Sequence, residues 1–225
     1  MSATFEGFEP DAVRFLLELR ANNDRAWFQP RKAEYERLLK EPLEALCVVL
    51  GERFAARGIP LRADARSPFR IYRDVRFSKD KSPYKTAIAA TLENGGYISF
   101  SAEGLGAGRG LYMPAPDQLD RYRRAVAHDR SGRQLVQVVS KLRRSGITVD
   151  AHDVLKTAPK GYAKDHPRIE LLRYKGLISW KQWPVGAWLG TRKAKERLVG
   201  FLRASKPLHD WLEKRVGPSE LAEDR

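Results

Sequence analysis

The sequence predicts an α+β fold in which a mainly antiparallel sheet is flanked by N-terminal and C-terminal helices. Apolar residues recur every three to four positions near both ends of the chain, and they alternate every second position in a central segment. The order of these elements is not the regular βαβ alternation of a parallel sheet. The 225 residues, 42% of them hydrophobic, can bury a sizeable core. We therefore expect a single domain over 1–215 and a short, disordered acidic tail over 216–225.

Three helices are predicted before residue 60. Pro10 suits the first turn of a helix over 10–21, because proline needs no hydrogen-bond partner for its nitrogen there. Asp24 can accept a hydrogen bond from the free N–H groups of a second helical region. Pro42 opens a third helix, which Gly58 closes.

The central segment predicts strands. The apolar period changes from 3.6 to 2 over 69–77, which indicates a strand. After a Ser-Pro turn, strands over 85–93 and 97–101 are joined by an Asn-Gly-Gly turn at 94–96. Residues 104–110 hold four glycines but match neither dinucleotide-binding nor Walker patterns. We favour a bulged or crowded strand over a phosphate-binding loop there.

Helical periodicity returns in the last half of the chain. It predicts helices that begin near Asp117 and extend over 132–145, 167–174, 191–204 and 207–216, with a strand over 177–180.

The positive charge is unevenly distributed. The chain carries 42 Lys/Arg against 28 Asp/Glu, a net charge of +14. Residues 1–61 have a net charge of −1, whereas 62–85 have +5 and 156–215 have +10. Such asymmetry favours a polyanionic partner, either nucleic acid or a phosphorylated small molecule. The alternative is a solvated basic surface.

The segment 70–85 is the strongest candidate site. It carries six cations and two carboxylates, and Arg73 shares its predicted strand face with apolar side chains. A buried Arg73 requires a partner carboxylate or a bound anion. We predict an anion-binding site in which guanidinium groups hold phosphate or carboxylate and lysines add attraction. Its residues are Arg70, Arg73, Arg76, Lys79, Lys81, Tyr84 and Lys85, with Tyr72 as a further possible stacking residue. The alternative is a set of structural ion pairs made by Asp74 and Asp80.

Signals for catalysis are weak. The four histidines share no metal-ligand spacing, and one cysteine supports no zinc site, so we expect no metal and no cofactor. Cys47 lies in an apolar run and is interpreted as a packed thiol. The catalytic residues are unknown; if the protein is an enzyme, the acid/base candidates are Asp74, Asp80 and His166.

The chain shows no targeting or membrane segment. Its N-terminus has no cationic stretch followed by an apolar one, and its apolar runs are too short to span a bilayer. We therefore expect a cytoplasmic protein without a membrane partner.

The run 70–85 resembles the signature of the domain of unknown function 2461 family. The likeness covers about residues 5–210 and includes the Asn/Trp-Phe element at 22–28, the glycine-to-proline stretch at 106–114 and a later block at 155–167. The resemblance implies an α+β domain and no nameable cofactor or catalytic residue. It adds Lys156, Lys160, Tyr162 and His166 as motif positions, of which Lys160 joins the predicted anion site. One departure is Ala87, where the family usually carries a polar residue.

These observations lead to three functional hypotheses. The first is a module that binds a phosphate-bearing ligand or nucleic acid through its basic segment. The second is an enzyme that acts on a phosphorylated or otherwise anionic substrate. The third is an interaction protein for an acidic partner.

Overall fold

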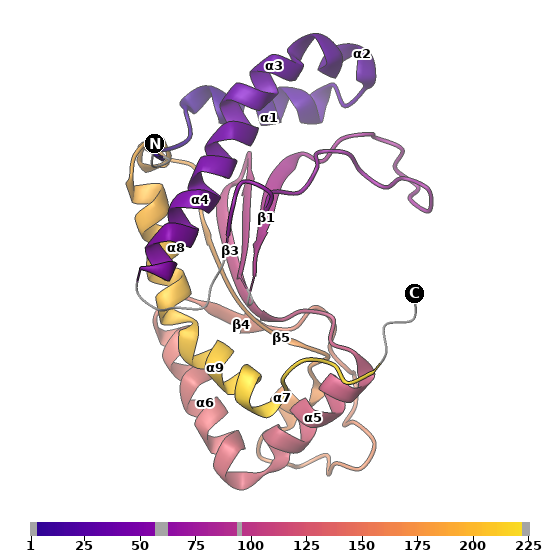
Figure 1. The fold of residues 1–225 in the computed structure, drawn as a ribbon. Coiled ribbons are helices and arrows are strands. Elements are labelled where there is room, and N and C mark those ends of the chain that lie inside the picture. Colours follow the sequence, from indigo (N-terminus) through magenta and orange to yellow (C-terminus); the bar gives the residue numbers. More distant parts are fainter. Residues whose placement is uncertain (1–3, 57–62, 94–95, 222–225) are drawn as a thin grey trace. The chain divides into compact units, whose positions relative to one another are not determined.

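The computed structural model describes residues 4–56, 63–93 and 96–221. The predicted α+β fold is confirmed: helices accompany a five-stranded sheet with the strand order β1-β2-β3-β5-β4 (Figure 1). The strands are β1 (Ala87–Leu92), β2 (Gly96–Ser101), β3 (Gly104–Leu111), β4 (Thr148–Asp150) and β5 (Leu177–Trp183). The helical segments are α1 (Pro10–Ala21), α2 (Arg25–Phe28), η1 (Gln29–Arg31), α3 (Lys32–Tyr35), η2 (Glu36–Lys40), α4 (Glu41–Ala55), α5 (Pro116–Ala127), α6 (Asp129–Arg144), α7 (Ile169–Arg173), η3 (Ala187–Gly190), α8 (Lys193–Ala204) and α9 (Lys206–Arg215).

We expected one domain over 1–215, and the chain forms two compact units. Unit 1 comprises Met1–Ala107 and Gln182–Phe201, and unit 2 comprises Gly108–Lys181 and Leu202–Arg225. The chain passes between the units within β3, within β5 and within α8, whose bounds include these junctions.

The N-terminal helices of unit 1 begin where the sequence predicts. Pro10 lies in the first turn of α1, and the Asp24 side chain accepts a hydrogen bond from the Trp27 N–H at 2.9 Å. The segments α2 to α4 follow one another directly, with a 3-10 turn and a π-helical turn between them. The predicted end of the third helix at Gly58 lies outside the described residues.

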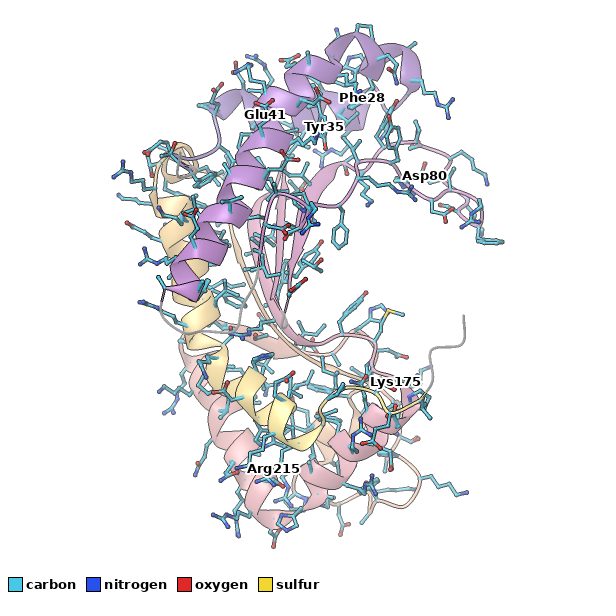
Figure 2. All side chains as sticks on the ribbon, in the orientation of Figure 1. Phe28, Tyr35, Glu41, Asp80, Lys175 and Arg215 are labelled. Carbon is cyan, nitrogen blue, oxygen red and sulfur yellow. The ribbon has the colours of Figure 1, made fainter. Side chains whose placement is uncertain are left out.

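An aromatic core holds these helices together. Phe28 stacks on Tyr84 with ring centroids 4.1 Å apart, and it contacts Tyr35 at 5.5 Å. Phe28 and Tyr35 are labelled among the N-terminal helices in Figure 2. Because Tyr84 belongs to the basic segment, this core attaches that segment to the helices.

The predicted hairpin is confirmed in its strands. β1 pairs antiparallel with β2 in a register that places Ala87 opposite Ser101 and Leu92 opposite Gly96. Residues 94–95 of the predicted turn lie outside the described residues. The helix α4 contacts β1, so the sheet of unit 1 is covered by the N-terminal helices (Figure 1).

The predicted strand over 69–77 is wrong. Within this segment Tyr72 alone forms a bridge, to Tyr84, and Phe77 is 96% exposed instead of sharing a buried face. The carboxylates explain the difference, because Asp74 and Asp80 accept hydrogen bonds from the backbone N–H groups two residues further along the chain. Such local bonds favour turns over a strand ladder.

The glycine-rich segment is a crowded strand, as predicted. In unit 1, a Cβ at Gly104 would lie 2.0 Å from the carbonyl oxygen of Trp183. In unit 2, a Cβ at Gly108 would lie 3.0 Å from the ring of Trp180. Glycine is therefore required in β3 by the neighbouring β5 rather than by a ligand.

Unit 2 is built around α5, α6 and α9, which contact one another in pairs (Figure 1). The indole N–H of the buried Trp211 donates to the Ser131 carbonyl at 3.0 Å and joins α9 to α6. Residues 216–221, which we expected to begin a disordered tail, lie along α5. Arg121 donates to the Val216 carbonyl at 2.6 Å, and Asp117 accepts from the Glu220 N–H at 2.8 Å. Residues 222–225 lie outside the described residues.

Candidate anion-binding site

The basic segment is an irregular loop, here called the basic loop (residues 70–85). Two hydrogen bonds join the two arms of its backbone, from the Arg73 N–H to the Pro83 carbonyl at 2.9 Å and from the Lys85 N–H to the Ile71 carbonyl at 2.8 Å. The side chain of Asn23 fixes the base of the loop. Its amide donates to the Tyr84 carbonyl and accepts from the Tyr84 N–H, both at 3.0 Å.

Internal ion pairs neutralise part of the basic loop. Arg73 pairs with Asp80 and also contacts the Ser82 carbonyl at 3.3 Å. Arg76 pairs with Asp74 at 2.7 Å. The alternative that Asp74 and Asp80 form structural ion pairs is therefore confirmed for these two arginines. The ion pairs do not use all the N–H donors of either guanidinium.

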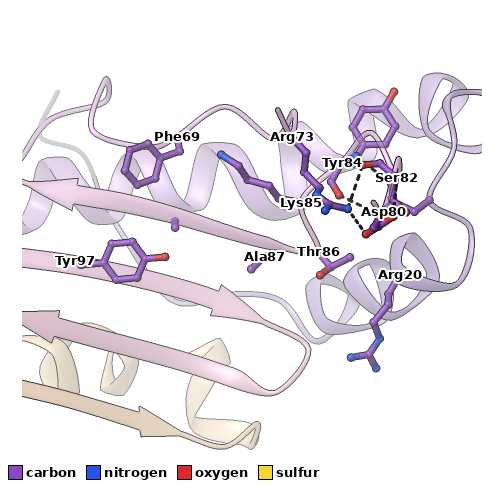
Figure 3. A pocket seen from close by; sticks show the side chains of 12 residues that line it. Arg20, Phe69, Arg73, Asp80, Ser82, Tyr84, Lys85, Thr86, Ala87 and Tyr97 are labelled. Carbon is purple, nitrogen blue, oxygen red and sulfur yellow. Dashed lines mark hydrogen bonds and ion pairs between the residues drawn. The ribbon is translucent and has the colours of Figure 1, made fainter. Parts of the chain in front are cut away.

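A cavity of about 750 Å³ opens beside the basic loop in unit 1. The loop forms one wall, β1 and β2 form another, and Arg20 at the end of α1 and Asn23 after it complete the cavity (Figure 3). The lining residues are Arg20, Asn23, Phe69, Arg73, Asp80, Ser82, Tyr84, Lys85, Thr86, Ala87, Ala89 and Tyr97.

Three of the predicted anion-site residues line this cavity, namely Arg73, Tyr84 and Lys85. Figure 3 shows the side chains of Arg73 and Lys85 beside each other above β1. The Tyr84 ring packs on Phe28, and its hydroxyl is buried without a hydrogen-bond partner among the described residues, so Tyr84 contributes to the wall by its backbone position.

The remaining predicted cations of the loop do not line the cavity. The Lys81 ammonium donates to the Val75 carbonyl at 2.9 Å, and Arg76 is held by Asp74. Arg70 and Lys79 are exposed. These four cations can add long-range attraction around the cavity, but they do not shape it.

Lys160 and His166 belong to unit 2, and neither lines the cavity. Lys160 is exposed. His166 Nδ1 accepts a hydrogen bond from the Arg168 N–H at 3.0 Å, which fixes its ring at the start of α7. This bond gives His166 a local structural role.

Two side chains that line the cavity have shifted pKa values. Burial lowers the pKa of Lys85 below its ordinary value of 10.5, and the positive charge of Arg70 lowers it further. Hydrogen bonds from Ser82, followed by that from Arg73, hold the pKa of the Asp80 carboxyl far below its ordinary value. Asp80 is therefore ionised at neutral pH and is a poor general acid or base. The lowered pKa of Lys85 means that its amine loses its proton more easily than that of an ordinary lysine.

Sequence reasoning missed Arg20, Asn23 and the aromatic wall of Phe69 and Tyr97 as cavity residues. Arg20 lies near the end of α1 and pairs with Glu103 at 2.6 Å. These residues are distant in sequence, and only the fold brings them together. Ala87, the departure from the family pattern, also lines the cavity, so a larger side chain at this position would enter it.

No group of three or more His, Cys, Asp or Glu side chains able to hold a metal ion occurs in the described part of the chain. Within the same residues, every helix is too short or too polar to cross a membrane.

Asn23 offers a direct test of how the loop is held. We expect Asn23→Ala to lower the free energy of unfolding by about 1–3 kcal/mol, because the backbone N–H and carbonyl of the buried Tyr84 lose their partner. Asn23→Asp keeps the acceptor but places a carboxylate against the Tyr84 carbonyl, so it is expected to cost at least as much at neutral pH. Urea unfolding measures both.

The adjacent Asn22 provides the control. Its amide donates to the Glu18 carbonyl at 3.0 Å in an exposed position, so Asn22→Ala is expected to cost less than about 1 kcal/mol. Equal effects at positions 22 and 23 would mean that Asn23 merely ends α1 and does not hold the loop.

Of the comparisons with known proteins, the one with protein families gives a match. Neither the curated proteins nor the solved structures give a significant match. One family, described as a conserved hypothetical protein (DUF2461), matches residues 11–211. This range begins within α1, includes the basic loop and the residues that line the cavity, and ends within α9. The chain therefore belongs to the DUF2461 family.

Proposed function

We propose that the cavity of unit 1 binds a small molecule that carries a phosphate group. The observation that supports this proposal is the convergence of Arg73 and Lys85 on one concave surface of about 750 Å³. Ligand pockets in proteins have volumes of about 300–1,000 Å³ and combine apolar walls with a few placed polar groups. This cavity has both features.

The two cations keep donors for an anion. A guanidinium has five N–H donors, and the contacts of Arg73 with Asp80, Ser82 and Ser78 use three. The Lys85 ammonium has three donors, and one is used by the Arg70 carbonyl at 2.9 Å. Two donors on each side chain therefore remain for phosphate oxygens, which arginine can bind bidentately.

An adjoining aromatic wall of the cavity suits an apolar or ring-bearing part of the ligand. Phe69 is 44% exposed and Tyr97 is half-buried, and both line the cavity together with Ala89. The Lys85 ammonium lies 5.4 Å from the Phe69 ring centroid, a cation–π contact that orients the lysine along this wall.

Two other functions remain as alternatives. An enzyme acting on an anionic substrate is favoured by one observation, the lowered pKa of Lys85, which moves an amine toward the range useful for acid/base chemistry. An acidic protein or nucleic acid is favoured by the exposed cations outside the cavity, of which Lys79 is one. Matched variants of Lys85 and Lys79 separate binding in the cavity from attraction by the cations outside it.

Calorimetric binding of pyrophosphate and of adenosine monophosphate tests the proposal. We expect Lys85→Met to weaken binding by roughly 10- to 100-fold, the value of a lost charge-assisted hydrogen bond. Lys79→Met removes the same charge from the same loop but outside the cavity, so it is expected to change affinity by less than about twofold.

Equal losses in the two variants would indicate diffuse attraction and favour nucleic acid or an acidic protein. If neither compound binds to the wild-type protein at millimolar concentration, the proposal is rejected.

The affinity is also expected to depend on pH through Lys85. Only the protonated amine attracts an anion, and its pKa in the free protein is below 10.5. Pyrophosphate affinity should therefore fall as the pH rises through that lowered pKa, at a lower pH than for an ordinary lysine. Lys85→Arg stays charged throughout and should flatten the profile between pH 7 and 10.5. Identical profiles for both proteins would exclude Lys85 as the titrating group.

A further inference from the structure

Unit 2 contains a second concave basic surface that the cavity of unit 1 does not include. Two cavities of about 400 and 330 Å³ adjoin at Lys214 and Arg215, which line both, and together they are called the unit 2 groove. Arg215 is labelled at this part of unit 2 in Figure 2. The cationic and imidazole side chains of this unit 2 groove are Arg121, Arg124, His128, Arg130, Lys214 and Arg215.

Three of these cations carry charge that no carboxylate compensates. Arg130, Lys214 and Arg215 make no ion pair or side-chain hydrogen bond with any described residue. The carboxylate that lines the groove is Asp210, and it is already paired with Lys206 at 2.6 Å. The groove therefore has a net positive charge that its own residues do not neutralise.

Helix electrostatics explains only part of this arrangement. Lys214 and Arg215 lie in the last turn of α9, where cations interact favourably with the helix dipole. Arg130 lies in the first turn of α6, where the dipole makes a cation unfavourable. Arg130 is thus a cation at the unfavourable end of a helix dipole with no carboxylate paired to it. A residue that does not stabilise the fold in this way points to a role in binding.

The groove stands on a rigid frame. Ser131 Oγ donates to the Ala125 carbonyl at 2.6 Å, and the Trp211 indole donates to the Ser131 carbonyl. The buried Arg168 donates to the carbonyls of Val126 and Ala127 at the end of α5, both at 2.7 Å. These bonds hold the backbone of the helices that carry the cations, so only the cationic side chains have to be ordered on binding.

We propose that the unit 2 groove binds the phosphodiester backbone of nucleic acid without reading its sequence. Trp211, the indole that lines the groove, is 7% exposed and its N–H is engaged, so it offers no stacking surface for a base, and the exposed ring in the groove is the imidazole of His128. What remains is repeated positive charge on two linked cavities, which matches successive phosphates rather than one small anion. This proposal does not depend on the function proposed for unit 1.

Fluorescence anisotropy with a labelled 20-base-pair duplex of random sequence, over a salt series, tests the proposal. The test variant combines Arg130→Gln, Lys214→Gln and Arg215→Gln, which breaks no ion pair or side-chain hydrogen bond within the described residues. Each phosphate contact contributes about 0.9 to the slope of log affinity against log salt. We expect the slope to become shallower by about two to three and the affinity at low salt to fall at least about tenfold.

The matched control combines Arg14→Gln, Lys32→Gln and Lys40→Gln, three cations with exposed side chains on the helical segments of unit 1. It removes the same net charge and is expected to leave the slope within about one unit of wild type. Lys85→Met is expected to leave duplex binding unchanged, which separates this groove from the cavity of unit 1.

Four results would overturn the proposal: no duplex binding by the wild-type protein at low salt, a salt-independent affinity, equal losses in the two triple variants, or equally tight binding of polyglutamate. The last would identify an acidic polypeptide as the partner.

Discussion

Replacing Gly104 by alanine is expected to lower the free energy of unfolding by about 3 kcal/mol or more. Gly104 has a φ of +126°, a conformation that L side chains rarely adopt, and strain of this kind costs roughly 1–3 kcal/mol. The added Cβ would also lie 2.0 Å from the Trp183 carbonyl oxygen. Because that oxygen is backbone, relieving the overlap requires β3 and β5 to separate, which adds a further cost of about 1–3 kcal/mol.

Gly200 provides the opposite case within the same unit. It lies in α8, and a Cβ there would meet nothing within 4 Å. Gly200→Ala is therefore expected to stabilise the protein by roughly 0.5–1 kcal/mol, the difference in helix propensity. Urea unfolding followed by circular dichroism measures both variants. A cost below about 1 kcal/mol for Gly104→Ala would mean that the strand is less tightly confined than the structure indicates.

Arg168 is expected to give the second-largest effect. Its guanidinium is buried and supplies the hydrogen bonds of two carbonyls at the end of α5, those of Val126 and Ala127. Arg168→Met leaves both carbonyls buried without a donor, so we expect a loss of about 2–4 kcal/mol. The measurement is again the free energy of unfolding.

The ion pair of Arg168 with Asp129 is expected to matter much less. The two groups are 3.1 Å apart, but the Asp129 side chain is 76% exposed. Asp129→Asn should therefore cost less than about 1 kcal/mol. If Asp129→Asn were as costly as Arg168→Met, the contribution of Arg168 to the free energy of unfolding would come from its ion pair and not from its hydrogen bonds to the two carbonyls.

The sequence predicts the fold class and most helices because their signals are local. Pro10 and Asp24 determine helix starts within a few residues of themselves, and the glycines of β3 indicate a crowded strand. The alternation over 69–77 was misleading, because Asp74 and Asp80 bond their own backbone and prevent a regular ladder.

The candidate site was predictable only in part. The basic loop is visible in the sequence as a run of cations. Which of these cations pairs with a carboxylate, as Arg73 and Arg76 do, and which bonds a backbone carbonyl, as Lys85 does, depends on how the loop turns. The Asn23 side chain bonds a residue 61 positions away, and no local pattern carries such a contact. The unit 2 groove likewise forms only when α9 returns to α6.

The chain also contains its own reporter of opening in unit 1. Cys47 is the one cysteine of the sequence, it is buried in α4, and burial raises the pKa of its thiol to about 12. A thiol reagent can therefore modify the native chain only during moments when α4 is exposed, so the rate of modification measures how often unit 1 opens. Gly104→Ala should accelerate this reaction directly. Arg168→Met lies in unit 2, which has no thiol, and would accelerate it only if the two units open together.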